Sequence, residues 1–325
     1  MKISFLTKPF SPLERTAKDI ERRFNYLKYT LMGNAYKAWT CTFPLGGHQD
    51  VVDSFIKGAK FFPDVELLIN PSRKDAKGSV LYVPSSWRTL RDAIILRRSG
   101  WAEKLIAGPL ICLEHIDEYG AIITDPAIDL YLLASRWVEN VYHDEAAQKH
   151  LILNDTAVWA AGVDHEVWTP QNKEPSDTLK NVLVYVKGQG KTMYQATLDM
   201  LNLYEKETKT LFCGTHTPTD YKKMLEWSDF VICLGGSETQ GLALAQAWSM
   251  NRQTLVYESD FIRKNKRNAA PYITEHTGKK WSDISELDEC LASLRKLTPR
   301  DWIIENQTNK IAFGKFLDIV YGLLG

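Results

Sequence analysis

A glycine-rich turn in the second half of the chain carries the residue types that could do chemistry. The apolar run Phe230–Leu234 meets Gly235 and Gly236, then a polar turn around Glu238, then a small-residue helix from Leu242. Such a turn brings backbone N–H groups and the positive end of a helix dipole to the carboxyl end of a strand, where they favour a phosphate. Because an anion site needs no acid, Glu238 is expected to bind sugar hydroxyls. The pattern indicates a nucleotide sugar.

Composition excludes several classes of protein. The 325 residues hold 40 Lys plus Arg and 40 Asp plus Glu, so zero net charge gives no global case for a nucleic-acid partner. The cysteines are odd in number, widely spaced and without a Cys-x-x-Cys pair, which predicts reduced thiols and neither a disulfide framework nor a zinc site. The N-terminus is too short in its apolar part for a signal peptide, and no apolar run approaches a membrane span. We expect a soluble, cytoplasmic protein.

Strand-like and helical runs alternate along the whole chain, which predicts an α/β protein with parallel sheets covered on both faces. The expected strands are Ile3–Thr7, Ala38–Phe43, Val65–Asn70, Val80–Val83, Leu105–Leu113, Leu130–Ser135, Val182–Val186, Thr210–Cys213, Phe230–Leu234 and Thr254–Tyr257. The proline-containing polar stretch Gly162–Lys180 separates the first six from the last four and is the expected linker. The sequence therefore predicts two α/β halves joined by one hinge.

The first helix is amphipathic. Its apolar stripe consists of Leu13, Ala17, Ile20, Phe24, Leu27 and Leu31, and its basic residues are Arg15, Lys18, Arg22, Arg23 and Lys28. Such basic residues most often form a solvated face. The alternative is a peripheral contact of this helix with the inner face of a membrane.

Three stretches resemble one family. Ser135–Tyr142 (SRWVENVY), Gly162–Pro170 (GVDHEVWTP) and the segment around Glu238 occur in the order and spacing of retaining GT-B glycosyltransferases of the family four type. The resemblance extends from about Leu130 to Pro271. It implies two Rossmann-like domains whose parallel sheets face a central cleft, with the nucleotide sugar on the C-terminal domain and the acceptor mostly on the N-terminal one.

The resemblance also sets the expected domain boundaries. Residues 1–165 would form the acceptor-side domain and residues 179–305 the nucleotide-sugar-binding domain. Residues 306–325 have a helical apolar pattern and would cross back onto the first domain. The implied activity transfers a hexosyl or related sugar to a glycan, lipid-linked or protein acceptor, as in polysaccharide biosynthesis.

Family positions on the donor side are matched in part. Glu238 matches the first acid of the family's Glu, seven residues, Glu signature, whereas the second position is Gln246, an amide that can still accept a hydrogen bond from a ribose hydroxyl but carries no charge. Lys187 and Lys191 are the candidates for the basic pair that neutralises the diphosphate. The expected donor-binding residues are Gly236, Ser237, Thr239, Gln240, Gly241 and Gln246. Because cations take the leaving-group charge, we expect no metal and no cofactor.

The first domain offers weaker candidates. His115 follows the apolar run that ends at Leu113, where family members often carry a histidine facing the donor sugar, and Gly47 and His48 could form a loop for the acceptor at the cleft mouth. The plainer interpretations are a buried histidine, solvated loop lysines at 187 and 191, and, for Glu238, an acid that stabilises the start of its helix.

Three rival functions remain. Gly190-Lys191-Thr192 after a strand suggests a P-loop nucleotide hydrolase, but Tyr185 stands where the Walker motif needs its first glycine. A sugar-nucleotide epimerase shares the GT-B architecture but usually needs acid and base carboxylates in the cleft, for which His115 and Glu114 are thin evidence. A non-catalytic GT-B-like subunit would be consistent with Gln246.

Overall fold

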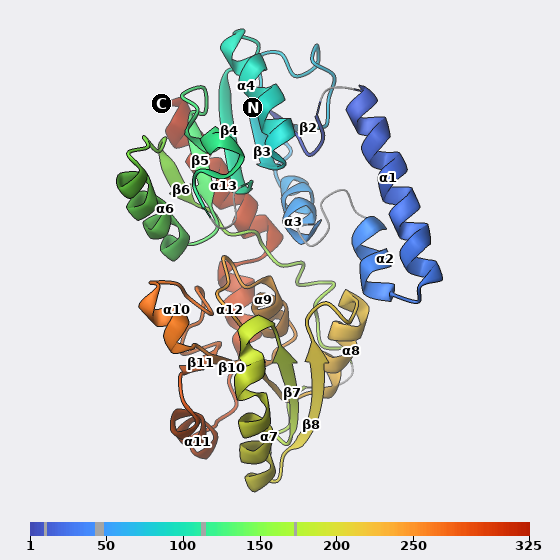
Figure 1. The fold of residues 1–325 in the computed structure, drawn as a ribbon, viewed down its shortest axis with the longest axis vertical. Helices are drawn as coiled ribbons and strands as arrows, with labels where there is room; N and C mark the ends of the chain where they lie inside the picture. The colour runs from blue at the N-terminus through green and yellow to red at the C-terminus, as the bar shows by residue number, and fades with distance from the viewer. Residues whose placement is uncertain (10–11, 43–48, 112–114, 172–173) are drawn as a thin grey trace. The chain divides into compact units, whose positions relative to one another are not determined.

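The computed structural model describes residues 1–9, 12–42, 49–111, 115–171 and 174–325, and these form two compact units (Figure 1). Unit 1 consists of Met1–Gly162 together with Lys310–Gly325, and unit 2 consists of Val163–Asn309. Each unit has its own parallel sheet and its own hydrophobic core. The predicted α/β architecture with two parallel sheets is confirmed.

The sheet of unit 1 has the strand order β2-β1-β3-β4-β5-β6, with all neighbouring strands parallel. The strands are β1 (Lys2–Phe5), β2 (Glu66–Ile69), β3 (Val80–Ser85), β4 (Lys104–Leu110), β5 (Leu130–Leu133) and β6 (Thr156–Val158). Strands β3 and β5 are buried along their whole length, as expected of central strands with helices on both faces.

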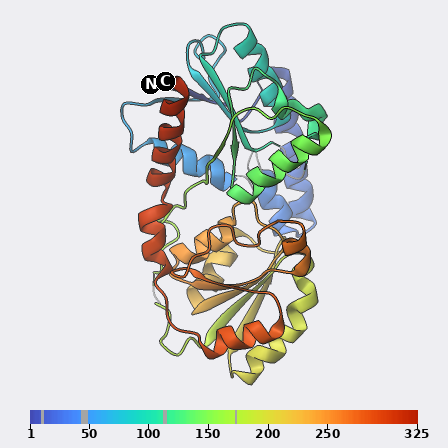
Figure 2. The ribbon, with the colours of Figure 1, turned by 90° about the vertical axis from the view of Figure 1, so that its left-hand side faces the viewer.

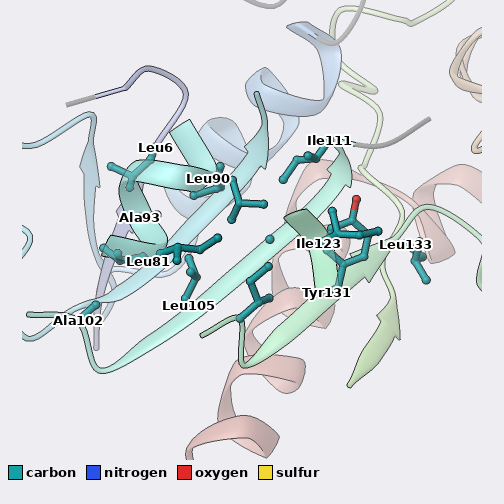
Figure 3. Packing of buried hydrophobic residues seen from close by; sticks show 14 of the residues in the cluster. Leu6, Leu81, Leu90, Ala93, Ala102, Leu105, Ile111, Ile123, Tyr131 and Leu133 are labelled. Atoms are coloured by element: carbon teal, nitrogen blue, oxygen red, sulfur yellow. The ribbon is translucent and has the colours of Figure 1, made fainter. Parts of the chain in front are cut away.

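Helices cover both faces of this sheet. The helices of unit 1 are α1 (Pro12–Leu31), α2 (Ala35–Thr42), α3 (Gln49–Ala59), α4 (Trp87–Arg98), α5 (Glu118–Ala121), α6 (Arg136–Lys149) and α13 (Asn309–Leu324). On one face, Leu90 and Ala93 of α4 pack with Leu81, Leu105 and other strand residues (Figure 3). On the other face, the rings of Phe313 and Phe316 of α13 lie 4.9 and 4.8 Å from Phe55 of α3. The C-terminal helix is therefore part of the core of unit 1.

The sheet of unit 2 has the strand order β11-β10-β9-β7-β8 and is also parallel throughout. Its strands are β7 (Asn181–Val186), β8 (Glu207–Phe212), β9 (Phe230–Leu234), β10 (Gln253–Tyr257) and β11 (Gly278–Trp281). Strands β9 and β10 are completely buried. Their carboxyl ends lie beside that of β7, because Val186 and Tyr257 both pair in register with Leu234.

The helices of unit 2 form two layers around its sheet (Figure 2). They are α7 (Tyr194–Leu203), α8 (Pro218–Trp227), α9 (Leu242–Ser249), α10 (Asp260–Lys264), α11 (Ile284–Ala292) and α12 (Pro299–Asn306). Alternate residues of each strand point to opposite layers: Val231 packs with α8, α9 and α12, whereas Ile232 packs with α7 and α11. This period of two fixes which side chains of β7 and β9 can reach the same pocket.

The strand predicted over Ala38–Phe43 is wrong. Residues 38–42 belong to α2, and Phe43 lies outside the described residues. The helix begins at Ala35 and follows Asn34, whose side-chain oxygen accepts the Lys37 N–H and whose carbonyl accepts the Ala38 N–H. An N-cap and packing on α1 outweigh the strand preference of the run Trp39-Thr40-Cys41-Thr42. The short strands β6 and β11 carry too few apolar residues to be predicted.

Candidate functional site

The candidate site lies at the carboxyl end of the unit 2 sheet, where β7 and β9 end side by side. The backbone N–H of Lys187, the residue after β7, donates to the carbonyl of Leu234 at 2.7 Å. The chain after Leu234 forms the glycine-rich turn, and α9 follows it. The structure therefore has the strand, turn and helix that the sequence predicts, with Lys187 next to the start of the turn.

Two glycines allow this close packing. A Cβ on Gly190, in the short helical turn Gly188–Met193 after β7, would overlap the carbonyl oxygen of Leu234. Gly241 caps the N-terminus of α9 with a φ of 80°, a left-handed conformation that glycine adopts without a steric penalty. Replacing either residue would displace the loops that surround the pocket.

An ion pair joins the two loops. The Nζ of Lys187 lies 2.6 Å from Oε1 of Glu238, and both side chains are partly exposed. The Glu238 N–H donates to the carbonyl of Asn268 at 2.8 Å, so the residue is fixed at its backbone as well as at its carboxylate. This geometry differs from the plainer interpretation of Glu238 as an acid that only stabilises a helix, because its carboxylate binds a cation from the loop after β7.

Both residues of the ion pair line a small apolar pocket. The pocket is lined by Tyr185, Lys187, Cys233, Gly235, Glu238, Gly241, Ala243, Leu244, Val256 and Ala269. Burial, and then the nearby Cys213, raises the pKa of Tyr185. Burial, and then the negative charge of Glu238, raises the pKa of the Cys233 thiol. Both groups are therefore neutral at ordinary pH, and Lys187 and Glu238 are the charged residues that line the pocket.

A second polar network fixes the segment that holds the Glu238 backbone. The Nζ of Lys280 donates to Oε1 of Glu258 at 2.9 Å and to Oδ1 of Asn268 at 2.8 Å. Glu258 also accepts the N–H of Ala269 at 3.1 Å. Because Asn268 accepts the Glu238 N–H, Lys280 and Glu258 act on the turn through one intervening residue.

The other predicted donor-side residues differ in whether they line this pocket. Gly241 lines it, whereas Gly236, Ser237 and Thr239 are half-buried in the turn. Gln240 and Gln246 are buried and are not among the residues that line the pocket. Lys191 is exposed on the turn after β7 and does not line the pocket either. The structure thus brings together Lys187 and Glu238, but does not place Lys191 with them.

His115 is the unit 1 candidate that the structure describes. The Nδ1 of His115 lies 2.6 Å from Oε1 of Glu145, and Glu145 also accepts the Ile116 N–H. Burial acts to raise the pKa of Glu145, but the Ile116 N–H, His115 and Lys149 outweigh burial and lower it. His115 is half-exposed and not the buried histidine of the plainer interpretation. Gly47 and His48 lie outside the described residues.

The described part of the chain shows no group of His, Cys, Asp or Glu residues that could hold a metal ion, and within it no helix is long and apolar enough to cross a membrane. Cys41, Cys213, Cys233 and Cys290 are free thiols, of which Cys233 and Cys290 are buried and Cys213 is exposed. Sequence reasoning missed Tyr185, although its spacing of two from Lys187 on a strand places both side chains on one face. It also missed Asn268, which no local pattern marks.

Solved structures share this fold. The apo form of the lipopolysaccharide outer core galactosyltransferase WaaB matches with a TM-score of 0.53 at 10% identity, covering 99% of each chain. The catalytic domain of starch synthase IV from Arabidopsis thaliana, bound to ADP and acarbose, matches with a TM-score of 0.50 at 9% identity, covering 77% of this chain and 73% of that one. The sequence matches no family model and no curated protein. The likeness establishes the fold, which is that of GT-B glycosyltransferases.

Proposed function

We propose that the pocket of unit 2 binds a nucleoside diphosphate sugar, and that the chain is a glycosyltransferase. It moves a hexosyl or related sugar to a glycan, lipid-linked or protein acceptor with retention of configuration. The observation that carries the proposal is the Lys187–Glu238 ion pair at the carboxyl ends of β7 and β9. Ligands of parallel α/β sheets bind at this edge. A cation for phosphate and a carboxylate for hydroxyls stand here side by side.

Lys187 and Glu238 contact different parts of the donor. Lys187 stabilises the negative charge that develops on the leaving diphosphate, with Lys191 as a second cation from the same turn, so that no metal is required. The N–H groups near Thr239, Gln240 and Gly241 hold phosphate oxygens at the start of α9. Glu238 accepts hydrogen bonds from sugar hydroxyls and fixes the anomeric carbon. The apolar residues that line the same pocket exclude water and strengthen both interactions.

The remaining residues have supporting roles in this proposal. Gln246 accepts a hydrogen bond from a ribose hydroxyl, and His115, oriented by Glu145, is the unit 1 residue that we assign to catalysis. Retention follows if the leaving diphosphate remains on the face that the acceptor hydroxyl attacks and takes its proton. The protein then contributes orientation and charge stabilisation, and no protein base is needed.

A panel of nucleotide sugars tests the proposal. The purified chain is incubated with each donor, first without acceptor, and the products are separated by chromatography. Slow release of free sugar and nucleoside diphosphate from one donor, faster with a glycan or lipid-linked acceptor, is the expected result. Conversion to a second nucleotide sugar would instead identify an epimerase. Calorimetric binding without turnover would identify a non-catalytic subunit, and nucleoside triphosphate hydrolysis without sugar-donor turnover would reject the proposal.

A further inference from the structure

Helix α1 exposes an apolar stripe, which we define as Ile20, Phe24, Leu27 and Leu31. These side chains are 63%, 67%, 57% and 80% exposed, and they lie one above the other at helical spacing. Met32, at the end of the stripe, is also largely exposed. Single exposed apolar residues are normal, whereas a contiguous set of this size marks an interaction surface.

The opposite face of α1 is polar and partly buried. Asp19 forms ion pairs with Lys8 and Arg22 at 3.8 and 3.4 Å, and the ring of Tyr29 lies 5.4 Å from Nζ of Lys37 on α2. In Figure 1, α1 and α2 form a helical hairpin at the side of unit 1. A helix that packs on a core turns its apolar face inward, and α1 does the reverse. Its apolar stripe therefore does not serve the core of unit 1.

Basic side chains flank the apolar stripe on both sides. Arg23 lies one turn from Ile20 and Leu27, and Lys28 lies one turn from Phe24 and Leu31; both cations are exposed. Each stands about 70° around the helix from the centre of the stripe, at 100° per residue. The exposed acid Glu21 lies about 90° from that centre, further round than Lys28 on the same side. The cations are thus the charges nearest the stripe.

We propose that the hairpin of α1 and α2 docks on an anionic lipid surface, with α1 lying in the plane of the interface. The apolar stripe enters the boundary between headgroups and acyl chains, and Arg23 and Lys28 extend along it to reach lipid phosphates. The positive charges of Arg23 and Lys28 beside the apolar stripe favour an anionic lipid surface as the binding partner. Two copies of the chain packed stripe to stripe would bring their own Arg23 and Lys28 side chains together, which is unfavourable. The inference needs no sugar donor and goes beyond the proposed function.

Co-sedimentation of the full chain with lipid vesicles tests this inference. Vesicles of phosphatidylcholine alone are compared with vesicles that also contain phosphatidylglycerol. We expect binding to the mixed vesicles at least about tenfold tighter than to phosphatidylcholine, and weaker as salt is raised. The double variant Phe24→Glu/Leu27→Glu should lose at least about tenfold in binding. The variant Arg23→Glu/Lys28→Glu should lose the preference for the anionic vesicles.

Ile152→Glu is the matched control, because Ile152 is 86% exposed in unit 1 and lies outside α1. It should bind vesicles like the unchanged protein, and all variants should keep its melting temperature. Failure of the unchanged protein to bind mixed vesicles would overturn the inference, as would an equal loss in Ile152→Glu. A dimer in light scattering that Phe24→Glu/Leu27→Glu dissociates, without vesicle binding, would show instead that the apolar stripe joins two copies.

Discussion

Lys187 and Glu238 form an ion pair of 2.6 Å across 51 residues of chain, and it ties the end of β7 to the turn after β9. A diphosphate that reaches this edge of the sheet competes with Glu238 for the same ammonium group. Because a phosphate is a stronger partner for the cation than one partly exposed carboxylate, donor binding should transfer Lys187 to the ligand and release Glu238 for the sugar. The ion pair thus couples the two halves of donor recognition.

Lys187→Ala should weaken the binding of a nucleoside diphosphate more than that of the monophosphate. A charge-assisted contact is worth about 1.5–3 kcal/mol, or about tenfold to a hundredfold in Kd. Titration calorimetry of both ligands measures the difference. Lys191→Ala should also weaken the binding of the diphosphate more than that of the monophosphate. The loss of affinity should be smaller than in Lys187→Ala, because Lys191 is exposed and does not line the pocket.

Lys180→Ala is the control for this series. Lys180 precedes the same strand at its opposite end and pairs with Glu207 at 2.7 Å. Its removal should leave both affinities unchanged. Equal losses for the diphosphate and the monophosphate in Lys187→Ala would reject the assignment of Lys187 to the diphosphate.

The network of Lys280, Glu258 and Asn268 should show energetic coupling. Lys280→Met leaves the carboxylate of Glu258 with one partner fewer in a half-buried position, and should lower the free energy of unfolding by about 1–2 kcal/mol. The double variant with Glu258→Gln should lose about 0.5–1 kcal/mol less than the sum of the single losses. Urea denaturation of the four proteins measures this. Strict additivity would show that the contact between Lys280 and Glu258 contributes no stability.

Lys280→Met also tests whether this network positions Glu238. Because Asn268 accepts the Glu238 N–H, Lys280→Met should also slow sugar transfer while leaving the affinity for a bare nucleotide unchanged. A parallel loss of nucleotide affinity would instead indicate that unit 2 as a whole is disturbed.

Local sequence patterns predicted the parts of the fold that strong periodicity controls. The buried run Phe230–Leu234 and the helix from Leu242 occur where expected, because apolar strands followed by glycine and a small-residue helix allow few other structures. The run at 38–42 was misassigned because its local strand preference is weak against an N-cap at Asn34 and packing on α1.

The candidate site was predictable only where its residues are close in sequence. Glu238 could be identified from its turn, and Lys187 from its place after a strand. Asn268 and Lys280 come from later segments, and only the pairing of β10 with β9 and β11 brings them near the turn. The exposure of the apolar stripe was not predictable either, because periodicity shows that one face of α1 is apolar but not which way that face turns.

Gly190→Ala should destabilise the protein, whereas Gly235→Ala should not. A Cβ at residue 190 would overlap the Leu234 carbonyl, and the turn after β7 would have to move at a cost of about 1–3 kcal/mol. Among the described residues no atom lies within 4 Å of a Cβ placed at residue 235, so that change should stay within about 0.5 kcal/mol. Thermal unfolding measures both. Similar melting temperatures for the two variants would show that the turn is not packed on β9 as described.

Glu238→Gln is the most direct test of the donor site. The change keeps the size of the side chain and removes its charge, so it should lower the rate of sugar transfer by about tenfold to a thousandfold, or about 1.4–4 kcal/mol. Binding of the bare nucleoside diphosphate should be unchanged or slightly tighter, because Lys187 no longer has a charged competitor.

Gln246→Ala should show the opposite pattern to Glu238→Gln in rate and nucleotide binding. Gln246 is assigned to the nucleotide ribose, so its loss should weaken nucleotide binding and reduce the rate at saturating donor much less. Steady-state kinetics with the identified donor and acceptor, together with calorimetry of the nucleotide, separate the two effects. Full transfer activity in Glu238→Gln would leave the carboxylate with a structural role only, as the partner that holds Lys187 and the turn together.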